Sequence, residues 1–154
     1  MITLRRILHP TDMSVTSERA LEYAISLAQQ HSSTLYLFHV IVNEVVAPVY
    51  ADPLGAIMPM LKPPARDAES GVLETLQALV PSGVRNMIPV EFLTRRGRPI
   101  MEVLRCAEEI AADIIVCGTH GYTGLKRIVL GSVAEELARR SPCPVLVVPQ
   151  RRKS

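Results

Sequence analysis

The sequence predicts an α/β fold: an open, doubly wound parallel sheet of five strands in a single domain, with helices on both faces. Apolar runs of strand length alternate with segments of helical periodicity, in the order β-α-β-α-β-α-β-α-β. The run Ile114 to Cys117 is continuously apolar, which is typical of a strand buried on both faces. Hydrophobic residues make up 48% of the chain and aromatic residues only 4%, so the core must be aliphatic.

The elements of the first half can be placed one by one. A strand is expected over residues 5–9 and ends at Pro10. The helix that follows begins within residues 14–17, where serine and threonine side chains can cap it, and ends near His31. Residues 34–41 are rich in β-forming side chains and predict the second strand.

Residues 43–64 contain five prolines, which forbid a long regular element. The segment is nevertheless too apolar for a free linker, and one hypothesis is a lid or packed loop over one end of the sheet. A helix over 66–80 and a third strand over 88–94 are expected next.

The second half continues the alternation. Pro99 can occupy the first position of a helix, where its missing N–H is not needed, and helical spacing of apolar residues continues to Ala111. The fourth strand is expected over 113–117. A helical pattern begins at Val133, and residues 145–148 form the fifth strand.

Composition limits the classes of function. The 154 residues fit one domain over 1–150 with a basic tail at 151–154, and a net charge of +2 does not indicate nucleic-acid binding. No segment resembles a membrane span or a signal peptide, so a cytoplasmic protein is expected. Cys106, Cys117 and Cys143 lack paired spacing and are expected to be buried hydrophobic residues in a reducing compartment.

A glycine-punctuated loop follows the fourth strand. Gly118 and Gly121 are separated by two residues, and nine more precede Gly131-Ser132 and a helix. Glycine lets a backbone approach a ligand closely, and a helix N-terminus offers free N–H groups to an anion such as a nucleotide phosphate. The spacing matches neither a Walker loop nor Gly-x-Gly-x-x-Gly. The alternative is a connection that binds nothing.

The expected strand order brings the segment after the first strand close to this glycine-punctuated loop. Right-handed crossovers are compatible with the strand order 3-2-1-4-5, in which strands one and four are neighbours where the winding reverses. Ligands of such sheets bind beyond the carboxyl ends of the strands. Residues 10–12 (Pro-Thr-Asp) after strand one and 118–121 after strand four are therefore expected to line one crevice.

The glycine spacing, together with residues 10–12, 97–99 (Gly-Arg-Pro) and the ending 143–148, resembles the universal stress protein (UspA) family over nearly the whole chain. The resemblance implies a Rossmann-like fold of the adenine nucleotide alpha hydrolase type. It also implies membership of the ATP-binding group, because members with the full glycine motif hold ATP. The implied role is a nucleotide-dependent dimeric sensor or adaptor in the stress response, with a protein partner that the sequence does not name.

The resemblance further implies an ATP site, with Mg or Mn as the candidate metal. Its residues would be Pro10, Thr11, Asp12, Val40, Gly118, Thr119, His120, Gly121, Lys126, Arg127, Gly131, Ser132 and Val133. Asp12 would accept hydrogen bonds from the ribose hydroxyls or take a metal-bridging position, or it caps the first helix. The backbone of Val40 would bond adenine, although Val40 could simply be core.

The remaining roles concern the phosphates. The three glycines would let main-chain N–H groups approach, and Ser132 would donate its hydroxyl and amide, or it is an ordinary helix cap. Lys126 and Arg127 would neutralise a triphosphate, or they are solvated. Thr119, His120 and Val133 would line the site, and nothing in the sequence orients His120 as a general base.

Two other functions compete with the leading one. The first is a slow ATPase or a nucleotidyl-transfer enzyme using the same crevice, although the sequence shows no arranged acid–base pair, nucleophile or Walker lysine. The second is a dimeric scaffold without nucleotide. A dimer is expected because strand 145–148 would be an apolar edge without protective charge, which predicts pairing with the same strand of a second chain.

Overall fold

A computed structural model describes residues 1–42, 45–46, 60–61, 68–119 and 131–150. Its main sheet has five strands in the order β5-β2-β1-β6-β7, and every neighbouring pair is parallel. The strands are β1 (Arg6–Pro10), β2 (Thr34–Ile41), β5 (Val90–Arg96), β6 (Ile114–Gly118) and β7 (Val145–Val148). Among these five strands, the order along the chain is 3-2-1-4-5, so the predicted doubly wound fold is confirmed.

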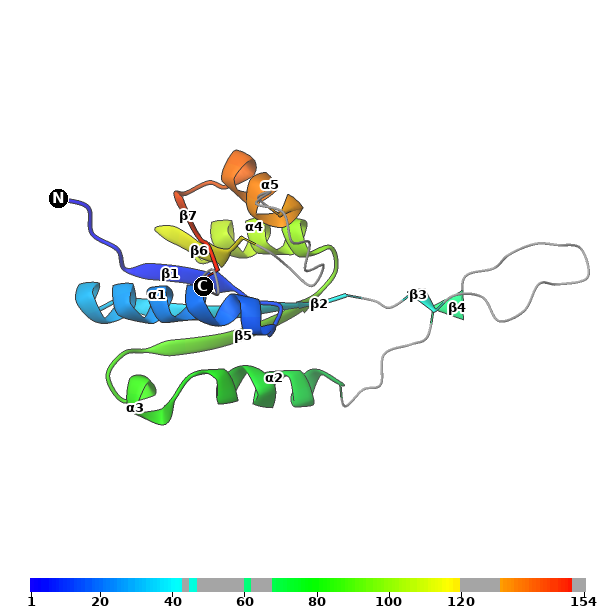
Figure 1. Cartoon of the computed structure of the whole chain (residues 1–154), viewed down its shortest axis with the longest axis horizontal. Helices are drawn as coiled ribbons and strands as arrows, with labels where there is room; N and C mark the ends of the chain where they lie inside the picture. The colour runs from blue at the N-terminus through cyan, green and yellow to red at the C-terminus, as the bar shows by residue number, and fades with distance from the viewer. Residues whose placement is uncertain (43–44, 47–59, 62–67, 120–130, 151–154) are drawn as a thin grey trace, which may run out of the picture.

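Helices cover both faces of this sheet (Figure 1). On one face lie α1 (Val15–His31) and α2 (Ala68–Leu79), and on the other lie α4 (Pro99–Glu109) and α5 (Ser132–Arg140). Successive strand residues point to opposite faces, so Ile7 packs in the core beneath α1 and α2, whereas Leu8 packs beneath α4 and α5. Both residues are fully buried.

Three details differ from the sequence expectation. The third strand of the main sheet runs over Val90–Arg96 rather than 88–94, because its pairing with β2 begins at Leu35 and Val90. A short helix, α3 (Ser82–Arg85), precedes it. Within 43–64, β3 (Val45–Val46) and β4 (Met60–Leu61) form an antiparallel pair that was not predicted. The rest of that segment, and with it the lid hypothesis, lies outside the described residues.

The cysteines lie as expected in apolar surroundings. Cys106 and Cys117 are buried, Cys143 is half-buried, and all three are free thiols. Burial raises the pKa of Cys106 and of Cys117 to about 11, so both thiols stay protonated and uncharged at neutral pH. In the described part of the chain, no helix combines the length and the apolar character that a membrane span requires.

At the amino end of the sheet, one carboxylate links β1 to β6. Asp113, just before β6, accepts hydrogen bonds on Oδ2 from the backbone N–H groups of Arg5 and Arg6, at 2.7 and 2.8 Å. These bonds join the starts of β1 and β6, which are more than a hundred residues apart in the chain. The relative position of the two strands is therefore fixed where they enter the sheet.

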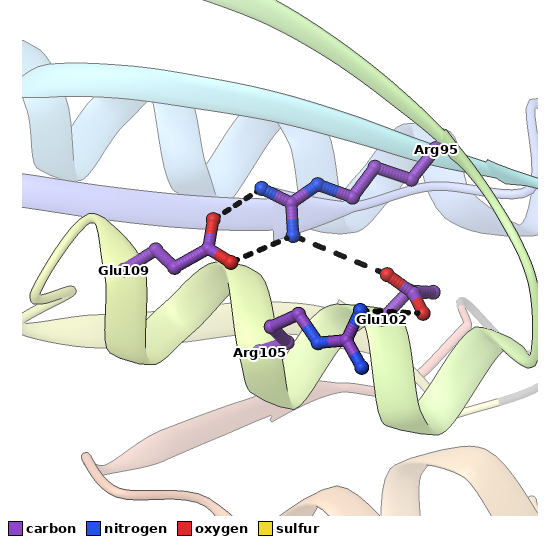
Figure 2. Close-up of polar contacts among 4 residues, drawn as sticks. All are labelled: Arg95, Glu102, Arg105 and Glu109. Carbon is purple, nitrogen blue, oxygen red and sulfur yellow. Dashed lines mark hydrogen bonds and ion pairs between the residues drawn. The ribbon is translucent and has the colours of Figure 1, made fainter.

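Charged side chains attach β5 to α4 (Figure 2). Arg95 of β5 forms an ion pair with Glu109 and lies 4.0 Å from Glu102 of α4. Arg105 Nη1 lies 3.5 Å from the other carboxylate oxygen of Glu102, whose side chain is only 12% exposed. With Glu91 and Arg96 also on β5, this edge of the sheet carries several charges.

The turn between β5 and α4 depends on a residue without a side chain. Gly97 has φ +151°, a conformation that side-chain-bearing residues rarely adopt. A Cβ atom built there would lie 2.9 Å from Cγ of Glu102. Glu102 is held by the charges around it, so it cannot move away without losing its contacts with Arg95 and Arg105.

We expect Gly97→Ala to lower the free energy of unfolding by about 1–3 kcal/mol, from backbone strain and from the contact with Glu102. The matched control is Gly71→Ala within α2, where a Cβ has nothing within 4 Å. This control should stabilise the protein by about 0.5–1 kcal/mol because glycine disfavours a helix interior. Urea unfolding followed by circular dichroism measures both, and an unchanged Gly97→Ala protein would contradict the prediction.

Candidate functional site

The crevice expected at the reversal of the winding begins where β1 and β6 separate. Their register consists of two pairs, Ile7 with Ile114 and Leu8 with Ile115. Beyond these pairs β1 continues alongside β2 as far as Pro10, and β6 continues alongside β7 as far as Gly118. The two carboxyl ends therefore belong to different halves of the sheet, which is the position where open α/β sheets bind ligands.

The segment after β1 is tied into the fold by Thr11. Its N–H donates to the carbonyl of Phe38 at 2.9 Å, which extends the contact with β2. Its buried hydroxyl lies 2.9 Å from the hydroxyl of Ser17 and accepts a hydrogen bond from the N–H of Met13 at 3.0 Å. Thr11 therefore holds the end of β1 against the first turn of α1, and Asp12 lies within this bonded turn.

Asp12 presents one engaged and one free carboxylate oxygen. Its Oδ1 accepts hydrogen bonds from the N–H of Ser14, at 2.9 Å, and from the Ser14 hydroxyl. Its Oδ2 is buried and has no hydrogen-bond partner among the described residues. The N-cap of α1 is Ser14, so the alternative reading of Asp12 as the cap is wrong. A carboxylate that is held by one oxygen and lacks a partner at the other is suited to a ligand that donates hydrogen bonds or to a cation.

Val40 lies near the end of the adjacent strand, and its side chain is core. The N–H of Leu35 donates to the carbonyl of Pro89, and the carbonyl of Ile41 accepts from the N–H of Gly97, so the backbone groups of Leu35 and Ile41 point toward β5. The carbonyl of Phe38 accepts from the N–H of Thr11 and points to the other side, toward β1. Because backbone groups alternate in direction along a strand, the N–H and C=O of Val40 are directed toward the side of β1. There β1 has already ended at Pro10, so these groups face the crevice side of β2.

The opposite wall is built from the end of β6 and the start of α5. Thr119 follows Gly118, donates its N–H to Val148 at 3.2 Å, and accepts a hydrogen bond from Gly131 at 2.7 Å. Gly131 is the N-cap of α5 and Ser132 is its first helical residue, so the reading of Ser132 as the cap is wrong. Ser132 and Val133 are exposed. The first N–H groups of a helix have no partner within it, and these can receive an anion.

Four expected site residues cannot be placed. His120, Gly121, Lys126 and Arg127 lie outside the described residues. Of the others, Pro10, Thr11 and Asp12 lie at the end of β1, Gly118 and Thr119 at the end of β6, and Gly131, Ser132 and Val133 at the start of α5. The hydrogen bond between Thr119 and Gly131 joins the last two groups directly.

The structure adds His9, which the sequence pattern had indicated only as a strand-end histidine. Its side chain is fully buried at the point where β1 and β6 part, and Nδ1 lies 2.7 Å from the carbonyl oxygen of Val116. Nε2 is buried without a partner in the described part of the chain. Burial lowers the pKa of His9 to about 4, so the ring is neutral and its Nδ1–H donates to Val116.

We expect acid to destabilise the protein through His9. The folded-state pKa of about 4 lies below the ordinary value of 6.5, so the unfolded chain binds the extra proton first as the pH falls. The contribution of His9 to stability is complete above pH 6.5 and is lost between pH 6.5 and 4, by at most about 3 kcal/mol.

Urea unfolding at half-unit pH steps measures this effect, and His9→Asn, which cannot titrate, is the matched control. The difference in unfolding free energy between the two proteins should change across this pH interval and be constant above it. If the unfolding free energies of the two proteins change in parallel with pH, the pKa of His9 is not lowered in the folded protein and the prediction is wrong.

Comparison with known proteins finds relatives that match nearly the whole chain. The model of the universal stress protein family matches residues 3–149. Universal stress protein MJ0531 of Methanocaldococcus jannaschii is 34% identical over 150 residues, covering 97% of this chain and 84% of the relative. Universal stress protein MJ0577 of the same organism is 29% identical over 160 residues, covering 97% and 98%.

Solved structures are similar in fold. UspA from Lactobacillus plantarum superposes with a TM-score of 0.76 at 22% identity, covering 96% of this chain and 99% of its own. A universal stress protein in complex with cAMP gives a TM-score of 0.67 at 21% identity, covering 97% and 100%. One from Archaeoglobus fulgidus in complex with dAMP gives 0.62 at 21% identity, covering 96% and 98%.

Proposed function

Because this chain belongs to the universal stress protein family, we propose that it binds an adenine nucleotide, and specifically ATP, in the crevice between the ends of β1 and β6. The observation that carries the proposal is the buried Oδ2 of Asp12, which has no hydrogen-bond partner among the described residues. It lies at the switch point of the sheet, where a nucleotide is expected to bind. Ribose hydroxyls are donors and would satisfy this acceptor.

Each part of a nucleotide has a matching group in the crevice. Adenine offers a donor and an acceptor on one edge, which complement the C=O and N–H that Val40 directs toward the crevice side of β2. The phosphates would lie at the start of α5, where N–H groups and the positive end of the helix dipole attract anions. The Ser132 hydroxyl is exposed at that position and can donate as well.

The solved relatives support the adenine and phosphate parts of this assignment, since cAMP and dAMP both carry an adenine and a phosphate on a pentose sugar. A triphosphate needs additional positive charge, and we assign that role to Lys126 and Arg127, with His120 and Gly121 completing the loop. A Mg²⁺ or Mn²⁺ ion bound to the phosphates would supply the remaining charge neutralisation. The free carboxylate oxygen of Asp12 fits such an ion by its chemistry, because hard divalent cations prefer oxygen ligands.

Asp12→Asn tests the proposal without disturbing the turn. Asparagine keeps an oxygen for the N–H and hydroxyl of Ser14 but replaces Oδ2, the free acceptor, with a donor. We expect calorimetry with Mg-ATP to show binding by the wild-type protein and about 10- to 100-fold weaker binding by Asp12→Asn, as for the loss of a charged hydrogen bond.

The control is Glu22→Gln, which removes a carboxylate charge from the exposed face of α1. It should bind as the wild-type protein does. Absence of binding by the wild-type protein would refute the proposed function, and equal binding by Asp12→Asn would refute the role of its carboxylate.

The protein is further proposed to work as a dimer, a nucleotide-dependent sensor or adaptor for a protein partner. β7 is the last strand of the sheet and is wholly apolar, Val145 to Val148. The carbonyl of Pro144 accepts from Ile115 of β6, and that of Val148 accepts from Thr119 just after β6. The backbone groups of Leu146 therefore also point toward β6, and the N–H and C=O of Val147 point to the open edge. Such an edge is a template for the same strand of a second chain.

Val147→Pro is expected to convert the dimer to a monomer. Proline removes an N–H that points to the open edge and leaves the hydrogen bonds between β6 and β7 in place. Leu146→Pro is the contrasting variant, since it removes a bond inside the sheet and should lower the melting temperature. Light scattering after size-exclusion chromatography measures the mass; a monomeric wild-type protein, or a dimeric and folded Val147→Pro protein, would contradict pairing through β7.

A further inference from the structure

The hydrogen-bond ladder between β1 and β6 is interrupted by a proline. In a parallel ladder, the N–H of a residue donates to the carbonyl of the residue before its partner. Leu8 is the partner of Ile115, and continuing this register makes residue 10 the donor to the carbonyl of Val116. Residue 10 is a proline, which has no N–H. Without another donor, the Val116 carbonyl would lose its place in the ladder.

The side chain of His9 supplies that donor. Its Nδ1 lies 2.7 Å from the Val116 oxygen, and the ring is completely buried. The bond therefore connects β1 to β6 one step beyond their last paired residues, through a side chain instead of the backbone. It is also the connection between the two strands that lies immediately before Pro10, Thr11 and Asp12.

The hydrogen bond from Nδ1 of His9 leaves the other ring nitrogen, Nε2, buried without a partner in the part of the chain that the structure describes, which is unfavourable for stability. A ring that donates through Nδ1 leaves Nε2 as an acceptor, and this atom is buried with no donor among the described residues. Within the described ranges, two groups act on the ring: the Val116 carbonyl of β6, which accepts its hydrogen bond, and the Asp12 carboxylate just after β1, which is the charged one. A buried polar atom left without a partner is rare in native proteins and requires an explanation, and a role at a functional site is one such explanation.

We propose that His9 is a positioning residue for the nucleotide site, fixing the distance between the Pro10–Asp12 turn and the Gly118–Thr119 end of β6. This inference rests on the proposed function, because the site it positions is the nucleotide crevice. The ring does not contact the ligand in this assignment. It determines whether the Asp12 carboxylate and the start of α5 can engage one nucleotide at the same time.

Three variants of His9 separate positioning from packing. In asparagine, Nδ2 occupies the place of the histidine Nδ1, so His9→Asn can still donate to Val116. In glutamine the donor lies one bond further out, and leucine has no donor at similar size. The control is Val80→Ala, which removes buried volume from the same core on the α2 side, away from the crevice.

Calorimetry with Mg-ATP and urea unfolding are performed on all five proteins. We expect His9→Leu and His9→Gln to bind about 10-fold more weakly, the equivalent of one lost hydrogen bond, and His9→Asn to bind within about threefold of the wild-type protein. Val80→Ala should lose stability and keep its affinity. If His9→Leu does not fold, His9→Gln carries the comparison.

The inference is overturned if His9→Leu or His9→Gln binds like the wild-type protein, if His9→Asn fails to restore affinity, or if Val80→Ala weakens binding equally. Any of these results leaves the proposed function intact, because the wild-type protein still binds. Absence of binding by the wild-type protein refutes the proposed function instead. In that case ¹⁵N NMR of the His9 ring still decides whether Nδ1 carries the proton, and a proton on Nε2 refutes the bond to Val116.

Discussion

The divergence of β1 from β6 is the constraint on which the rest of this protein depends. At their amino ends the two strands are joined by one carboxylate, Asp113, which accepts two backbone hydrogen bonds. Toward their carboxyl ends the pairing of β1 with β6 stops at Leu8 and Ile115, whereas β1 remains paired with β2 and β6 with β7. The sheet is continuous at one end and split at the other, and the candidate site exists because of that split.

Most of the fold could be predicted from apolar periodicity. The five main strands and the helices between them follow from continuous apolar runs alternating with helical spacing, and Pro99 begins α4 as its missing N–H suggests. Their order does not follow from periodicity; right-handed crossovers only make it one of a few compatible orders. The limits of β5 could not be predicted, because a strand starts where its neighbour offers hydrogen bonds, and β2 does so from Val90. The two-residue strands β3 and β4 are too short to leave a periodic signal.

The site was predictable in its backbone and not in its side-chain details. Connection lengths and strand order place the turn at 10–12 and the end of β6 at one edge of the sheet. Whether Asp12 or Ser14 occupies the N-cap position of α1 could not be decided from sequence, since both are common N-cap residues, and only the backbone geometry shows that the position belongs to Ser14. The hydrogen bond of His9 depends on the register between β1 and β6, which the sequence does not show. The sequence shows a histidine directly before a proline at the end of a strand, and this pattern is informative only once Val116 is known to lie opposite.

The two margins of the sheet differ in chemistry. β5 carries Glu91, Arg95 and Arg96, and its Arg95 is engaged by α4, whereas β7 is entirely aliphatic. Addition of a second chain at β7 would therefore give a ten-stranded sheet, five strands from each chain, that is bounded at both ends by charged strands. Growth would stop there, so in such a dimer the charged β5 strands at both ends would prevent further chains from adding to the sheet and forming fibres.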